Sequence, residues 1–288
     1  MNVGGFGARL HGVFDSLGQL CVGIDPHPHL LQQWGLPDSA DGIREFGLRV
    51  VDATAGRAGI VKPQVAFFER HGSVGFAALE AVLVAARAAG LVVIADVKRG
   101  DIGTSVEAYG QAWLTPGSPL EADAMTIGAY QGVGSIEAPM RLALDNGKGL
   151  FVLTATSNPE SREIQTATIS SGERAGSSVA ASILGNVVGW NAELSAGEHG
   201  SIGVVLGATV DFAKYGIDLR SLAKTPSTPV LAPGFGHQGA RYSELGSLYG
   251  PAAPFAVVSA SRSILEAGAD GIDGAVRAAA REVFECRG

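Results

Sequence analysis

An apolar run in the stretch "VVIADVKRGDIGTS" (92–105) ends in a cluster of charge, with Asp96, Lys98 and Asp101 inside six positions. Residues two apart on a strand point to the same side, so Asp96 and Lys98 should share a face. Gly100 lets the chain turn, and Asp101 then comes from the following loop. A buried ion pair adds little stability, because desolvation offsets most of the attraction. We therefore interpret the cluster as part of a site that carries out chemistry. The alternative is a structural salt bridge at the end of a strand.

The cluster predicts a particular kind of chemistry. A lysine held among carboxylates keeps its proton, since the negative charges favour the ammonium form. Such a lysine is a fixed cation and proton donor, and it is a poor Schiff-base nucleophile. The pattern favours a reaction that makes a carbanion and then protonates it.

Polar residues also follow other apolar runs of the chain. These residues are Asp25 after "LCVGI", Lys62 in "GIVKPQ", Ser157 after "GLFVLTAT", and Ser261 and Arg262 after "FAVVSA". Each alone is compatible with an ordinary turn, cap or surface position. Their meaning depends on the elements that carry them.

Eight short apolar runs recur along the chain, and continuous runs of this kind are typical of parallel strands covered on both faces. They occupy residues 20–25, 59–64, 91–98, 124–128, 149–156, 201–208, 229–236 and 255–262. Ala-rich segments with helical periodicity lie between them, for example 39–56 and 73–90, with Gly90 as the expected end of the second, and a last one closes the chain at 263–285.

Eight strands alternating with helices over about 250 residues predict a (β/α)8 barrel of the α/β class. We expect a single domain over residues 1–288, with a long insertion at about 157–200 after the fifth strand. A doubly wound sheet is the alternative. No G-x-G-x-x-G follows the first strand, which weakens a dinucleotide-binding version of that fold.

In such a barrel the functional groups lie at the C-terminal ends of the strands, where all of these polar residues fall. The loop "PGFGHQG", which begins at Pro233, is rich in glycine and can turn backbone N–H groups toward an anion. Arg262, after the eighth strand, adds a bidentate donor. Loops after strands seven and eight form the usual phosphate site of this fold, so we expect a phosphorylated ligand.

Composition excludes several classes of protein. The net charge is −7 and no run of Lys or Arg occurs, which argues against nucleic-acid binding. No apolar run approaches the roughly 20 residues of a membrane span, and residues 1–19 lack the continuous apolar region and cleavage site typical of a signal peptide. We expect a cytoplasmic protein in which Cys21 and Cys286 are reduced thiols. No Cys and His spacing fits a metal site, so no metal is predicted.

The motif D-x-K-x-x-D at Asp96, Lys98 and Asp101 resembles that of the orotidine 5′-phosphate decarboxylases. The segments "GIDPHP", "VKPQVAFFE", "TATSNP", "APGFGHQG" and "SASRSIL" are similar to further segments of that family, over nearly the whole chain. "DVKRGDIGTS" together with the long insertion resembles a divergent bacterial subgroup. The motif alone also occurs in related sugar-phosphate decarboxylases.

The resemblance implies a cofactor-free conversion of orotidine 5′-monophosphate to UMP and CO2, the last step of de novo pyrimidine nucleotide synthesis. The enzyme would be a homodimer with shared active sites. Asp96 would lie against the departing carboxylate and Lys98 would protonate C6. Lys62 would contact the ribose hydroxyls and the charge network. Asp101 would reach the 2′-hydroxyl region and Lys98 from the other subunit.

The resemblance also implies which residues bind the substrate. Asp25 would bind the ribose or the base side, and Ser157 the amide edge of the pyrimidine. Gln238 and Arg262 would bind the 5′-phosphate, with Pro233 at the start of their loop.

Two departures from the family pattern are visible. The family usually has its loop threonine four residues after the last aspartate, whereas here Thr104 is three and Ser105 is four residues after Asp101. Either hydroxyl is a candidate to enter the neighbouring site. Ser261 stands where the family often has glycine, and its backbone N–H remains available to substrate.

Two other functions stay open at this level. One is a metal-dependent sugar-phosphate decarboxylase or epimerase on the same barrel, which would lose activity in EDTA. The other is a barrel that binds a nucleotide without transforming it.

Overall fold

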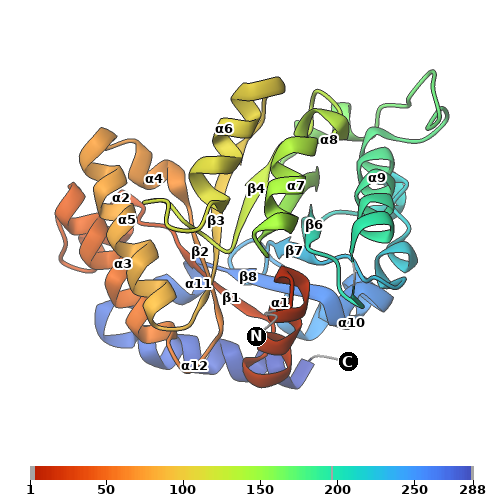
Figure 1. Cartoon of the computed structure of the whole chain (residues 1–288). Coiled ribbons are helices and arrows are strands. Elements are labelled where there is room, and N and C mark those ends of the chain that lie inside the picture. The colour runs from red at the N-terminus through yellow and green to blue at the C-terminus, as the bar shows by residue number, and fades with distance from the viewer. Residues whose placement is uncertain (1–3, 196, 287–288) are drawn as a thin grey trace.

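Eight parallel strands form a closed barrel in chain order in the computed structural model, which describes residues 4–195 and 197–286 (Figure 1). β1 pairs with β8 through Leu20 and Val258, which closes the sheet and rules out an open doubly wound arrangement. The predicted (β/α)8 fold is confirmed. The strands are β1 Leu20–Ile24, β2 Ile60–Pro63, β3 Val92–Arg99, β4 Ala124–Ile127, β5 Gly149–Ala155, β6 Ile202–Leu206, β7 Val230–Pro233 and β8 Ala256–Ala260.

Helices surround the barrel. They are α1 Phe6–Leu17, α2 Pro28–Gln33, α3 Ala40–Thr54, α4 Val65–Glu69, α5 Gly72–Ala88, α6 Gly103–Leu114, α7 Glu137–Asp145, α8 Ser161–Gln165, α9 Val179–Leu194, α10 Leu245–Tyr249, α11 Arg262–Leu265 and α12 Gly268–Cys286. Short 3-10 turns are η1 Val133–Ile136, η2 Phe212–Tyr215, η3 Leu219–Ala223, η4 Tyr242–Glu244 and η5 Gly250–Phe255.

The predicted helices agree with the structure except at the end of the chain. The segments 39–56 and 73–90 contain α3 and α5, and Gly90 lies just past α5 with a left-handed φ of 75°. The segment 263–285, expected as one helix, forms the separate helices α11 and α12. Gly268 has a φ of 78° at the start of α12, so the chain changes direction there.

The interior of the barrel is filled by apolar side chains. Cys21, Ile60, Val92 and Phe151 belong to this inner cluster, and α1 adds Phe6 to it. The rings of Phe6 and Phe151 meet edge to face at 6.0 Å. The helix α1 therefore covers the end of the barrel where the strands begin, and a ligand can enter at the opposite end.

The connection from β5 to β6 is the longest in the fold. It contains α8, an isolated bridge between Thr168 and Ser178, and then α9, which packs on β5 and β6. The α9 helix thus occupies the usual place of a barrel helix, and the extra length precedes it. Figure 1 shows this extra segment extending past the end of the barrel beside α8.

No helix among the described residues combines the length and the apolar character needed to cross a bilayer.

Candidate active site

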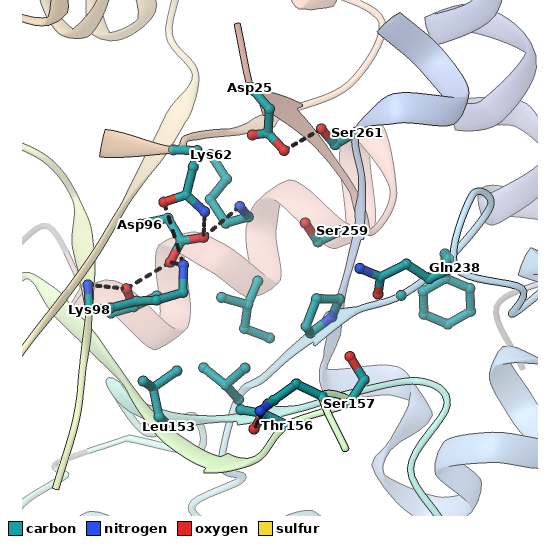
Figure 2. A pocket seen from close by; sticks show the side chains of 18 of the residues that line it. Asp25, Lys62, Asp96, Lys98, Leu153, Thr156, Ser157, Gln238, Ser259 and Ser261 are labelled. Atoms are coloured by element: carbon teal, nitrogen blue, oxygen red, sulfur yellow. Dashed lines mark hydrogen bonds and ion pairs between the residues drawn. The ribbon is translucent and has the colours of Figure 1, made fainter. Parts of the chain in front are cut away.

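A cavity of about 270 Å³ opens at the C-terminal ends of the strands. Figure 2 shows side chains from opposite sides of the barrel turning toward it. Its lining includes most of the residues that the sequence singled out: Asp25, Lys62, Asp96, Lys98, Ser157, Pro233, Gln238, Ser261 and Arg262. Within residues 4–195 and 197–286, no group of three or more His, Cys, Asp or Glu side chains is arranged to hold a metal ion.

Asp96 is the centre of the charged cluster. Its Oδ2 lies 2.9 Å from Lys62 Nζ and its Oδ1 lies 2.7 Å from Lys98 Nζ. The two lysines differ in burial, because the Lys62 side chain is 7% exposed and that of Lys98 is 46% exposed. Lys62 is therefore the buried partner of the carboxylate, and Lys98 is the cation that faces the open cavity.

Two neutral side chains complete the hydrogen bonds of this carboxylate. Gln64 Nε2 donates to Asp96 Oδ2 at 3.0 Å, and Thr126 Oγ1 donates to Asp96 Oδ1 at 2.9 Å. Neither residue was singled out from the sequence. Gln64 stood in the quoted segment "GIVKPQ", but Thr126 carried no signal, since a lone threonine is ordinary in a buried strand.

The electrostatics of the cluster hold it in its charged form. Burial alone would raise the pKa of Asp96, but Lys62 and Lys98 outweigh burial and hold that pKa well below its usual range. Burial likewise opposes the charge on Lys62, yet the carboxylates of Asp96 and Asp25 raise the pKa of this lysine. At neutral pH the carboxylate is ionised and the buried lysine is protonated.

Lys98 reaches Asp96 through an irregular backbone. The residue is left-handed, with a φ of 48°, and the pairing of β3 with β4 shifts register between Ala95 and Arg99. Lys98 N donates to Thr126 Oγ1 at 3.0 Å, which supports the bend. The side chains of Asp96 and Lys98 meet as expected, but they do so through this irregular backbone and not through the regular alternation of side chains along a strand. A left-handed non-glycine residue costs about 1–2 kcal/mol.

Asp25 is fixed from the other side of the cavity. Ser261 Oγ donates to Asp25 Oδ2 at 2.5 Å, across the join between β1 and β8. The second oxygen, Asp25 Oδ1, is buried and has no hydrogen-bond partner among the described residues. A buried acceptor without a partner is costly, so this oxygen is suited to a ligand hydroxyl.

The glycine-rich loop after β7 turns back on itself beside Arg262. Gly234 and Gly236 have φ of 118° and 73°, which side chains rarely adopt, and Gly236 N donates to Ala240 O at 2.8 Å. Gln238, at the tip of this turn, lines the cavity together with Arg262 at the start of α11. The arrangement offers a guanidinium, an amide and backbone N–H groups to an anion.

The loop after β5 forms the wall opposite the charged cluster, where Figure 2 shows Thr156 and Ser157. Asn158 of the same loop also lines the cavity. Gln165 of α8 holds Thr156 through two hydrogen bonds, to Thr156 N at 2.9 Å and to Thr156 Oγ1 at 3.0 Å. Sequence reasoning missed Gln165 because nothing in the sequence indicates that α8 folds back on this loop.

Three predicted residues do not line the cavity of this chain. Asp101 Oδ1 accepts a hydrogen bond from Ile102 N at 2.9 Å, and Thr104 and Ser105 are exposed in the first turn of α6. Large apolar side chains are exposed on the same side of the barrel mouth, with Ile102 59% and Tyr130 82% exposed.

Comparisons with known proteins agree with this geometry. The family model described as "Orotidine 5'-phosphate decarboxylase / HUMPS family" matches residues 18–275. A relative from Salinispora tropica named orotidine 5′-phosphate decarboxylase is 44% identical, over 98% of this chain and 97% of its own length. A relative of the same name from Streptomyces coelicolor is 44% identical over 92% of this chain and 91% of its own length.

Solved structures show the same barrel. A protein from Streptomyces avermitilis superimposes with a TM-score of 0.90 at 42% identity, covering 99% of this chain and 97% of that one. The OMP decarboxylase of Leishmania donovani superimposes with a TM-score of 0.73 at 28% identity, covering 98% of both chains.

Proposed function

The chain belongs to the orotidine 5′-phosphate decarboxylase / HUMPS family, and from this premise we propose that it converts orotidine 5′-monophosphate to UMP and CO2. This reaction is the last step of de novo pyrimidine nucleotide synthesis. The observation that carries the proposal is the half-exposed Lys98 ammonium, held 2.7 Å from the buried Asp96 carboxylate in a cavity whose far end suits a phosphate.

The substrate would span the cavity. Its phosphate would lie in the loop that begins at Pro233, against Gln238 and Arg262. Its ribose would lie between Asp25 and Lys62, where Asp25 Oδ1 offers an acceptor. The pyrimidine would then extend toward the loop after β5, with its amide edge at Ser157.

In the chemical step the bond between C6 and the carboxylate carbon breaks, CO2 leaves, and the electron pair remains on C6. The ring delocalises this charge poorly, so a fixed ammonium beside C6 stabilises the transition state electrostatically. Lys98 then gives one proton to C6 and recovers it from solvent, which its exposure permits.

Asp96 has a second role in the proposal. Its carboxylate stays ionised because Lys62 and Lys98 both contact it. A second carboxylate placed beside it is repelled, and this repulsion is relieved when the substrate carboxylate leaves as neutral CO2. Asp96 would thus favour decarboxylation while it also orients Lys98.

We further propose a homodimer in which each subunit completes the site of the other, in the cytoplasm. Asp101, Thr104 and Ser105 all lie outside the cavity of their own chain, just before α6 or in its first turn, and Asp101 with one of the two hydroxyls would enter the neighbouring site. The exposed side chains Ile102 and Tyr130 would be buried at such an interface.

The direct test is the pyrimidine absorbance of orotidine 5′-monophosphate after the protein is added, with UMP and CO2 identified as products. Loss of that absorbance at equal rates with and without EDTA supports the proposal. Activity that EDTA abolishes would favour a metal-dependent reaction. Tight nucleotide binding without any absorbance change would leave a binding protein.

A further inference from the structure

We propose that Gln165 of α8 is a positioning residue that sets how tightly the site binds the pyrimidine base. The inference rests on the proposed function and adds a residue to it. Gln165 accepts a hydrogen bond from Thr156 N at 2.9 Å and donates one to Thr156 Oγ1 at 3.0 Å. One side chain thereby fixes both the backbone and the hydroxyl of the first loop residue after β5.

The hydrogen bonds continue from Thr156 along the loop in one direction. The Thr156 hydroxyl donates to Asn158 Oδ1 at 2.8 Å, and Asn158 Nδ2 donates to Glu160 Oε2 at 3.0 Å. A hydroxyl has a single proton. Because Gln165 donates to Thr156 Oγ1, the Thr156 proton is directed to Asn158, and the orientation of the Asn158 amide follows.

The same loop is held from a second point of α8. Ser161 Oγ lies 2.9 Å from Thr156 O and 2.8 Å from Asn158 O, within hydrogen-bonding distance of both carbonyl groups. Thr156 is therefore held at its N–H, its carbonyl and its hydroxyl. Ser157 lies between these fixed residues, and no described residue hydrogen-bonds to its hydroxyl. The hydroxyl is thus placed by its neighbours and left available to a ligand.

This contact is local, and the folding of the barrel does not depend on it. The five-residue helix α8 contains no buried residue, and Ile164 is 50% exposed. Removing the Gln165 amide opens no cavity in the apolar core. We expect the loop that faces the base to become less well ordered. The phosphate end of the site should be unaffected, because Arg262 lies on another element.

The experiment compares two ligands that share a sugar phosphate and differ in the base. Inhibition or binding constants are measured for UMP and for ribose 5-phosphate, with wild type, Gln165→Ala and the control Glu163→Ala. Glu163 is an exposed residue of the same helix that lies outside the cavity. We expect Gln165→Ala to weaken the binding of UMP about tenfold, as the loss of two hydrogen bonds implies. The binding of ribose 5-phosphate should weaken less than about twofold.

A second pair of variants keeps the test decisive if Gln165→Ala folds poorly. Thr156→Ser retains the hydroxyl and should bind both ligands like wild type. Thr156→Val should weaken the binding of UMP more than that of ribose 5-phosphate. Adding Gln165→Ala to Thr156→Val should weaken the binding of UMP little further, because both substitutions disrupt the same hydrogen-bond network. Equal weakening of both ligands, or no change in either, would overturn the inference.

Failure of this inference differs from failure of the proposed function. A wild-type protein that decarboxylates orotidine 5′-monophosphate, while Gln165→Ala shows no selective loss of UMP, contradicts only the role of Gln165. A wild-type protein that binds neither ligand contradicts both.

Discussion

Gly23 of β1 and Ser261 after β8 share a space that has room for only one side chain. A Cβ added to Gly23 would lie 2.7 Å from Ser261 Cβ and 2.9 Å from Ser261 Oγ. Ser261 can therefore donate to Asp25 only because residue 23 is glycine. The glycine on β1 accommodates the serine that departs from the usual family pattern.

We predict that Gly23→Ala displaces Ser261 and with it the Asp25 carboxylate. The expected result is a fall in kcat/KM of roughly tenfold or more and a lower melting temperature, since an overpacked core costs about 1–3 kcal/mol. Adding Ser261→Gly to Gly23→Ala should restore the melting temperature but not the hydrogen bond to Asp25. A double variant no more stable than Gly23→Ala would contradict this steric relationship.

Lys98→Ala should abolish turnover without unfolding the protein. The Lys98 side chain is 46% exposed, so its removal leaves no large cavity, whereas the proposed reaction loses its proton donor. We expect kcat to fall by more than about ten-thousandfold, which exceeds what general acid catalysis alone typically contributes, because the electrostatic stabilisation is lost too. The measurements are the absorbance assay and thermal unfolding. Substantial remaining activity would refute the proton-donor role.

Acid should destabilise the fold partly through Asp96. The folded pKa of Asp96 lies below its unfolded value of about 3.9 because Lys62 and Lys98 contact it. A group with a depressed folded pKa contributes its full stability above the unfolded pKa, and this contribution is lost as pH falls toward the folded value. The free energy of unfolding, measured with denaturant between pH 7 and pH 3, should fall more steeply with decreasing pH for wild type than for Asp96→Asn. Identical pH profiles would contradict the assignment.

Mixing inactive variants tests whether the active sites are shared. If Asp101 acts from the other subunit, mixing Lys98→Ala with Asp101→Asn should restore some activity, because one of the two sites in a mixed dimer is then complete. The control mixes Lys98→Ala with Asp96→Asn, whose side chains meet within one chain, and should restore none. No recovery in the first mixture, with subunit exchange shown independently, would mean that Asp101 does not act across the interface.

The sequence by itself determined the barrel and the end of it at which the candidate site lies. Continuous apolar runs predict strands buried on both faces, and chain order then puts Asp25, Lys62, Asp96 and Arg262 at one mouth. Nothing beyond local pattern and strand direction is needed for that result, which is why these positions were predictable.

Only the tertiary structure decided which side chains meet. The left-handed φ of Lys98 depends on how β3 pairs with β4, and the contact of Gly23 with Ser261 exists only because β8 closes on β1. Gln165 reaches Thr156 because α8 folds back over the end of β5. Strand register, barrel closure and loop packing fix these contacts. They bring together residues that are distant in the chain, or they bend the backbone away from the regular alternation of a strand. A local sequence pattern contains no information about either effect.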